Sequence, residues 1–214
     1  MPVRLNSSGG GSVTLDVPST AGTFTLNLPA ADGSVVAANN SGLVNFSQRP
    51  TVNGAPIGIN LGTAQNSTSG TSIDFTGIPA GVRRVTVMFR DISTNGSNNL
   101  QIQLGTSAGI DATNYLGAES TAVGATAVQN STGFIVKSNI AAAGALHGIA
   151  FLSLLNPSTN LWVESGTLAT SNTTQVGVSA GSKALSGPLD RIRITTVNGT
   201  DVFDAGTINV AWEF

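Results

Sequence analysis

Apolar and polar residues alternate with a period of two along much of this 214-residue chain. Alternation puts every second side chain on the same face of a strand, so each such run is predicted to bury one face. No long segment has apolar residues at the three-and-four spacing of a helix. The predicted strands cover residues 12–17, 22–29, 83–91, 98–105, 191–197 and 207–214.

Glycine, asparagine, serine and proline separate these runs at short intervals, as in residues 94–99 and 106–109. Many short strands with frequent turn signals are typical of antiparallel sandwiches and barrels. We therefore expect an all-β fold, an antiparallel β-sandwich of the jelly-roll type.

The end of the chain carries the strongest local signal. Asn198–Gly199 lies between two alternating runs, and both residue types tolerate the positive φ of a tight hairpin. A second turn is predicted at residues 204–206, which makes residues 189–214 a three-stranded meander. Its last strand would bury Val210, Trp212 and Phe214 on one face.

The pattern divides the chain into three parts. Residues 1–52 are strand-rich but hold few large apolar residues, too few for a good core of their own. They are interpreted as an N-terminal attachment segment, residues 53–70 as a linker, and residues 71–214 as the head domain. Within the head, residues 117–133 and 168–187 have the weakest pattern and are predicted to be loops or edge strands.

Composition adds one anomaly, which is the scarcity of charge. Only 9% of the residues are charged, against about a quarter in an average soluble domain. A neutral surface suits a protein that covers much of itself in an assembly, or an extracellular or virion component; an unusually neutral monomer is the alternative. The net charge of −2 provides no basic footprint for nucleic acid.

The chain contains no cysteine, so disulfides and thiolate metal sites are excluded. Its first residues lack the apolar core of a signal peptide. The most apolar stretch, residues 139–155, is short for a bilayer span and is interrupted by glycine. We expect no membrane insertion.

Catalytic motifs are missing from the sequence. The single histidine, His147, lies in an apolar run without a Gly-x-Ser-x-Gly elbow, and it is expected to be a hydrogen-bonded core or interface residue. No phosphate loop, dinucleotide fingerprint or calcium loop appears. We expect no enzyme, no cofactor and no metal site.

Paired carboxylates are the remaining route to catalysis, because two of them can hydrolyse glycans. The sequence does not show whether any two face each other. Their places beside arginines and turns favour roles as caps and ion-pair partners. The candidates are Glu164, Asp190, Asp201, Asp204 and Glu213.

Two aromatic residues could stack on a sugar ring. Trp162 is expected to pack in the core or in an interface, whereas Tyr115 lies beside an Asn-rich turn and is equally compatible with exposure and burial. Asp111, Asn114 and Tyr115 are the candidate host-contact residues.

Two segments of the head resemble a known family. "IDFTGIPAGVRRVTVMFRDISTNGSNNLQIQLGTSAGIDATNYLG" (73–117) and "LSGPLDRIRITTVNGTDVFDAGTINVAWEF" (185–214) resemble the C-terminal domain of bacteriophage and prophage tail-fibre or related virion proteins. "LWVESGTLA" and "SAGSKALSG" follow in the expected order at 161–169 and 179–187. The N-terminal part resembles the segments that open many phage fibre proteins.

The resemblance implies a virion appendage on the surface of a phage particle. It implies a homotrimer whose N-terminal segment binds other virion proteins and whose sandwich contacts a host glycan or protein. It carries over no catalytic residues. A capsid decoration or head-fibre protein with a mechanical role fits the short chain equally well, and a glycan-degrading spike is the third possibility.

Overall fold

The computed structural model describes residues 3–6, 9–10, 12–15, 50–52, 55–121 and 127–214. The chain forms two compact units, Met1–Ser47 and Gln48–Phe214. In the first unit, β1 (Val3–Asn6) and β2 (Ser12–Leu15) pair as an antiparallel ribbon. Most of the predicted attachment segment, residues 16–49, lies outside the described residues.

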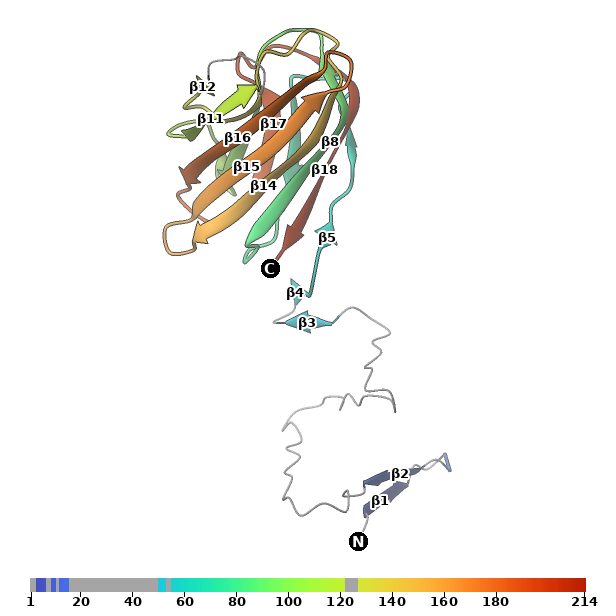
Figure 1. Cartoon of the computed structure of the whole chain (residues 1–214). Helices are drawn as coiled ribbons and strands as arrows, with labels where there is room; N and C mark the ends of the chain where they lie inside the picture. The colour runs from blue at the N-terminus through green and yellow to red at the C-terminus, as the bar shows by residue number, and fades with distance from the viewer. Residues whose placement is uncertain (1–2, 7–8, 11, 16–49, 53–54, 122–126) are drawn as a thin grey trace. The chain divides into compact units, whose positions relative to one another are not determined.

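The second unit is a sandwich of two antiparallel sheets (Figure 1), and every regular element in the described residues is a strand. The all-β sandwich prediction is therefore confirmed, while jelly-roll connectivity stays a prediction. The nine-stranded sheet has the order β12 (Val128–Gln129), β11 (Leu116–Thr121), β16 (Gln175–Ala184), β15 (Leu161–Thr170), β14 (Leu146–Asn156), β8 (Arg84–Thr94), β18 (Phe203–Glu213) and β5 (Asn60–Leu61), with β6 (Gln65–Asn66) also on β18.

The five-stranded sheet forms the other layer. Its order is β10 (Gly109–Asp111), β9 (Leu100–Thr106), β17 (Arg191–Thr196) and β7 (Ser72–Thr76), and β13 (Phe134–Lys137) also pairs with β9. A separate short ribbon joins β3 (Thr51–Val52) to β4 (Ala55–Pro56).

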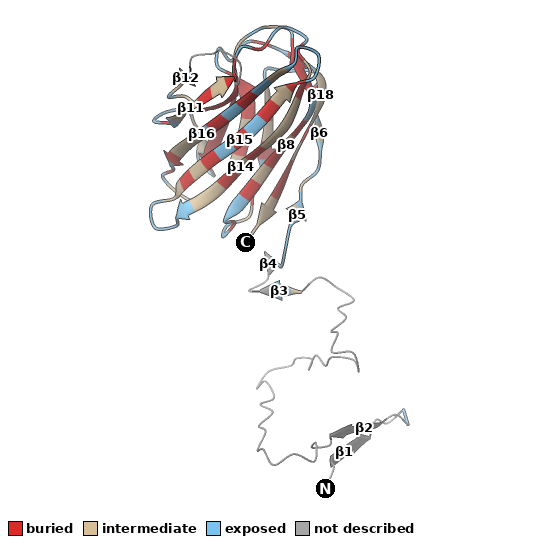
Figure 2. Cartoon of the chain, in the orientation of Figure 1, coloured by how far each residue is buried: buried red, intermediate tan, exposed pale blue. Residues whose placement is uncertain are grey.

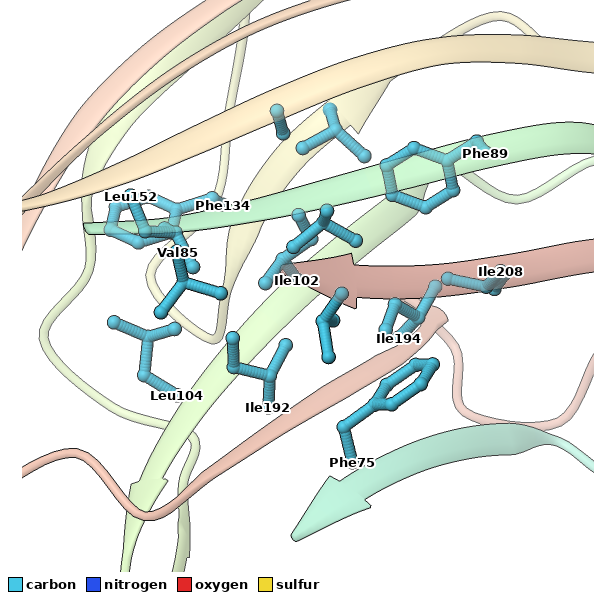
Figure 3. Packing of buried hydrophobic residues seen from close by; sticks show 14 of the residues in the cluster. Phe75, Val85, Phe89, Ile102, Leu104, Phe134, Leu152, Ile192, Ile194 and Ile208 are labelled. Atoms are coloured by element: carbon cyan, nitrogen blue, oxygen red, sulfur yellow. The ribbon is translucent and has the colours of Figure 1, made fainter. Parts of the chain in front are cut away.

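The inward side chains of the two sheets meet in one apolar core (Figure 3). Because side chains alternate across each strand, the period of two seen in the sequence becomes alternate burial. Each large apolar side chain that is fully buried stabilises the fold by about 1.5–3 kcal/mol. The core includes Phe75, Val85, Phe89, Ile102, Leu104, Leu152, Ile192, Ile194 and Ile208.

The predicted meander at residues 189–214 is wrong. β17 belongs to the five-stranded sheet and β18 to the nine-stranded sheet, so the Asn198–Gly199 turn carries the chain from one layer to the other. Oδ1 of Asn198 accepts the backbone N–H groups of Thr200 and Asp201 at 3.1 and 3.3 Å, which stabilises the turn by itself. A turn signal is local, whereas strand partners are decided by packing.

The turn predicted at residues 204–206 is also absent. β18 runs through this position with a bulge, where Gly206 has φ +100° and faces Asp91, itself at φ 53°. A Cβ at position 206 would lie 2.4 Å from the Asp91 carbonyl oxygen, so the bulge requires glycine. Further along β18, Val210 is buried and Trp212 packs against the core as predicted, but Phe214 is 38% exposed.

One of the two weakly patterned regions contains a regular inner strand. β16 occupies half of residues 168–187 and lies between β15 and β11, so the prediction of a loop or edge strand there is wrong. Several of its inward positions are glycine or serine rather than large apolar residues, so the sequence of β16 lacks the usual apolar alternation. β11, in the other region, lies near the edge of the sheet. Residues 60–66 of the predicted linker pair with β18.

The sandwich has two distinct ends. Asn60 pairs with Trp212 where the chain enters the sandwich; this connector end also carries the loops at 77–83, 112–115, 157–160 and 185–190. The loops at 95–99, 138–145, 171–174 and 197–202 lie at the opposite, far end (Figure 1).

Candidate functional site

Tyr115, the aromatic member of the predicted host-contact group, is a core residue with only 3% exposure. Its ring meets Phe134 edge to face at a centroid distance of 4.9 Å. Its hydroxyl donates to the Asp111 carbonyl at 2.8 Å and accepts the N–H of Leu104 at 2.6 Å. Burial raises the pKa of Tyr115. The exposed alternative for Tyr115 is therefore wrong, because its ring and hydroxyl are both occupied inside the sandwich.

Asp111 lies beside this ring and pairs with a buried lysine. Nζ of Lys183 lies 2.6 Å from Oδ2 of Asp111 and donates to the Thr113 carbonyl at 2.7 Å. Partial burial of Asp111 acts against its ionisation, but the hydrogen bonds from Lys183 and Thr113 outweigh it and lower the pKa of the carboxyl. Asp111 thus holds the turn together. No signal in the sequence connected it to Lys183.

Asn114 is the exposed member of the group, in the left-handed conformation at φ 55°. A hollow of about 370 Å³ adjoins the turn and is lined by Tyr115, Leu116, Gly117, Gln129, Asn130 and Ser131. The structure therefore brings Asp111, Asn114 and Tyr115 together at the connector end. Host contact by this turn stays a prediction.

His147 lies at the far end with its side chain 37% exposed. Its Nε2 is 3.1 Å from Oδ1 of Asp91 and 3.2 Å from Oγ of Ser171, while its Nδ1 accepts the Asp91 N–H at 3.4 Å. The predicted hydrogen bonding is confirmed, although the residue lies at the surface rather than in the core. A catalytic triad needs acid and nucleophile on opposite ring nitrogens. Here both lie on Nε2, which leaves no free lone pair to activate Ser171.

Two glutamates lie inside the sandwich, which the sequence did not predict. Oε1 of Glu164 accepts a 2.8 Å hydrogen bond from Ser179, and burial raises the pKa of Glu164 to about 7. Glu119 is fully buried 4.0 Å from Nζ of Lys137, which also donates to Thr121 at 3.1 Å. Burial lowers the pKa of Lys137, and the Glu119 charge opposes that effect only in part.

The other candidate carboxylates act as ion-pair and turn partners, as predicted. Asp190 lies 2.7 Å from Arg191, and Glu213 lies 3.9 Å from Arg84. Asp201 accepts from Asn198 at 2.6 Å, which lowers its pKa. Ser93 donates to Asp204.

No protein-family model, curated protein or solved structure matches this chain. In the described part of the chain, no three His, Asp or Glu side chains gather where they could hold a metal ion. The same residues include no helix of the length and apolarity needed to cross a membrane.

Proposed function

We propose that this chain is a structural protein of a bacteriophage particle. It is a trimeric fibre or spike, anchored to other virion proteins by its N-terminal residues, and it presents the β-sandwich to the surface of the host. It works by binding and has no catalytic role.

The observation that carries this proposal is the difference between the two ends of the sandwich. The chain enters at the connector end, and loops rich in asparagine, serine and threonine lie at the far end. A sandwich attached through its N-terminal side would present these far-end loops outward. Exposed loops held by a rigid scaffold are common sites of recognition.

Side-chain amides hold the far-end loops in place. Oδ1 of Asn95 accepts the N–H of Val202 at 2.9 Å, and Oδ1 of Asn172 accepts the N–H of Ala145 at 3.0 Å. Such loops lose little entropy on binding, which favours affinity. Their hydroxyl and amide groups are uncharged donors and acceptors, so the chemistry suits a neutral glycan or a polar protein surface.

A competition assay tests the recognition step. The purified chain should inhibit adsorption of the phage to its host, and Ser97→Lys in an exposed far-end loop should abolish inhibition. Ala112→Lys, in the turn that contains Asn114, tests the predicted contact at the connector end. Thr159→Lys, exposed in another connector-end loop, is the matched control and should inhibit like the native chain.

Antibody-labelled virions imaged by negative stain test the location. Antibody on a tail appendage agrees with the proposal, and antibody on the phage capsid supports the capsid decoration alternative. Release of reducing ends from host polysaccharide would instead support the glycan-degrading spike. If native chain and all three lysine variants fail to inhibit adsorption, host recognition by this sandwich is refuted.

A further inference from the structure

The outward side of the nine-stranded sheet is unusually apolar. We call the outward positions of β11, β16, β15 and β14 the outer face (Figure 2). Its apolar members are Leu116, Ala118, Val176, Val178, Ala180, Ala184, Leu161, Val163, Ala169, Ile149, Phe151 and Leu155.

Several of these side chains are open to solvent in the single chain. Leu116 is 70% exposed, Val178 is 52% exposed and Val176 is 42% exposed. An antiparallel sheet with one face on the core normally carries polar residues on the other face. Contiguous apolar surface of this kind marks an interaction site.

The outer face also lacks ionised side chains. No Asp, Glu, Lys or Arg occupies an outward position on these strands. The remaining outward residues are His147 at one end, Asn156 at the other end of β14, and serines or threonines. The nearest charges lie on β8 and β18, where Arg84 pairs with Glu213 at 3.9 Å and lies 4.6 Å above the Phe151 ring. Two such faces can approach without charge repulsion, whereas a charged partner finds no complement.

The dimensions of the outer face suit an interface between copies. β11 has 6 residues and the other three strands have 10 or 11. At about 4.8 Å between strands and about 3.4 Å per residue, the outer face covers about 600 Å². Two facing copies would bury at least about 1,200 Å², which reaches the range of specific, stable interfaces.

We infer that copies of this chain cover the outer face in the assembled protein. The inference rests on the proposed function in one respect, because that function requires several copies to work together. It adds which surface joins them: the Leu116–Val176–Val178 region contacts a neighbouring copy, and the far-end loops stay open.

Single cysteines test the inference directly, since the native chain has none. The full-length Val178→Cys variant places a thiol on the outer face, and Val202→Cys places one in a far-end loop as the matched control. In an isolated copy the thiol at position 178 would react faster, because Val178 is 52% and Val202 is 36% exposed. We expect the opposite: maleimide labelling at position 178 at least ten-fold slower, after each rate is normalised to the denatured chain.

Light scattering on the native chain supplies the second readout. We expect the mass of two or more chains of 21.5 kDa each, and a mass of three chains agrees with the proposed trimer. A mass of one chain, or labelling at position 178 as fast as at position 202, overturns the inference. Protection at position 178 without inhibition of phage adsorption would refute host recognition while leaving the interface in place. If the chain inhibits phage adsorption while position 178 is labelled as fast as position 202, the interface is refuted and host recognition stands.

Discussion

The Ser179 hydroxyl donates a 2.8 Å hydrogen bond to Oε1 of Glu164 inside the sandwich. Gly166 lies next to both groups: a Cβ there would fall 2.7 Å from the Ser179 oxygen and 2.8 Å from the Glu164 oxygen. The glycine thus leaves the space that the carboxyl and hydroxyl occupy. The other oxygen of Glu164 is buried without a hydrogen-bond partner in the structure, so the ionised form of this side chain is costly.

This arrangement predicts that the protein is more stable in mild acid than in mild base. Burial raises the pKa of Glu164 from 4.5 to about 7, so the folded state binds the proton more tightly than the unfolded state. The resulting stabilisation is complete below pH 4.5 and disappears as the pH rises through about 7. Urea unfolding followed by tryptophan fluorescence should show a loss of about 2–4 kcal/mol between pH 5 and pH 8.

Glu164→Gln is the control for this pH dependence. It keeps an acceptor for Ser179 and removes the Glu164 titration, so the loss of stability between pH 5 and pH 8 should disappear. Lys137 acts in the opposite direction, since its lowered pKa makes folding more favourable as the pH rises. A native chain that gains stability from pH 5 to pH 8 would contradict the role assigned to Glu164.

Gly177→Ala should destabilise the fold strongly. A Cβ at position 177 would lie 2.1 Å from Oε1 of Glu119 and would push that carboxylate away from Lys137. Disturbing a buried ion pair costs about 3–5 kcal/mol, measured here as a lower urea midpoint. Gly187→Ala is the control, because its Cβ would meet only Thr106 at 3.7 Å. Equal midpoints for the two variants would refute the close packing at Gly177.

Tyr115→Phe should lower the free energy of unfolding by about 1–3 kcal/mol, because the buried N–H of Leu104 loses its acceptor. Asn114→Gly, one residue away at positive φ, should leave the unfolding free energy nearly unchanged. The pair therefore separates the buried hydroxyl of Tyr115 from the exposed side chain of Asn114 in their effect on stability. Thermal unfolding checks the difference, and an unchanged melting temperature for Tyr115→Phe would show that its hydroxyl is not needed.

Removing residues 207–214 should abolish cooperative unfolding. These residues form most of β18, which lies between β8 and the strands β5 and β6, and they bury Ile208 and Val210. Removing Phe214 alone should change stability little, because this side chain lies beyond the strand and is 38% exposed. Far-UV circular dichroism and a urea titration check both. A stable chain without residues 207–214 would exclude β18 as a core strand.

The residue pattern alone determined the class of the fold and four of the strands that border the apolar core, β8, β9, β17 and β18. In runs such as residues 83–91 and 191–197, one side of the strand packs on large apolar side chains of the core. Every second residue is therefore apolar, and this period of two is visible in the sequence. Trp162 was expected to pack in the core or in an interface, and it is 2% exposed.

Tertiary structure alone decided which strands pair and where polar groups are buried. The Asn198–Gly199 turn reads as a hairpin because its signal covers four residues, yet the partners of β17 and β18 depend on contacts with strands more than 80 residues away. Lys183 and Asp111 lie 72 positions apart and meet only after folding. β16 escaped detection because its inward glycines and serine accommodate polar side chains from β11 and β15, and such complementarity exists only in three dimensions.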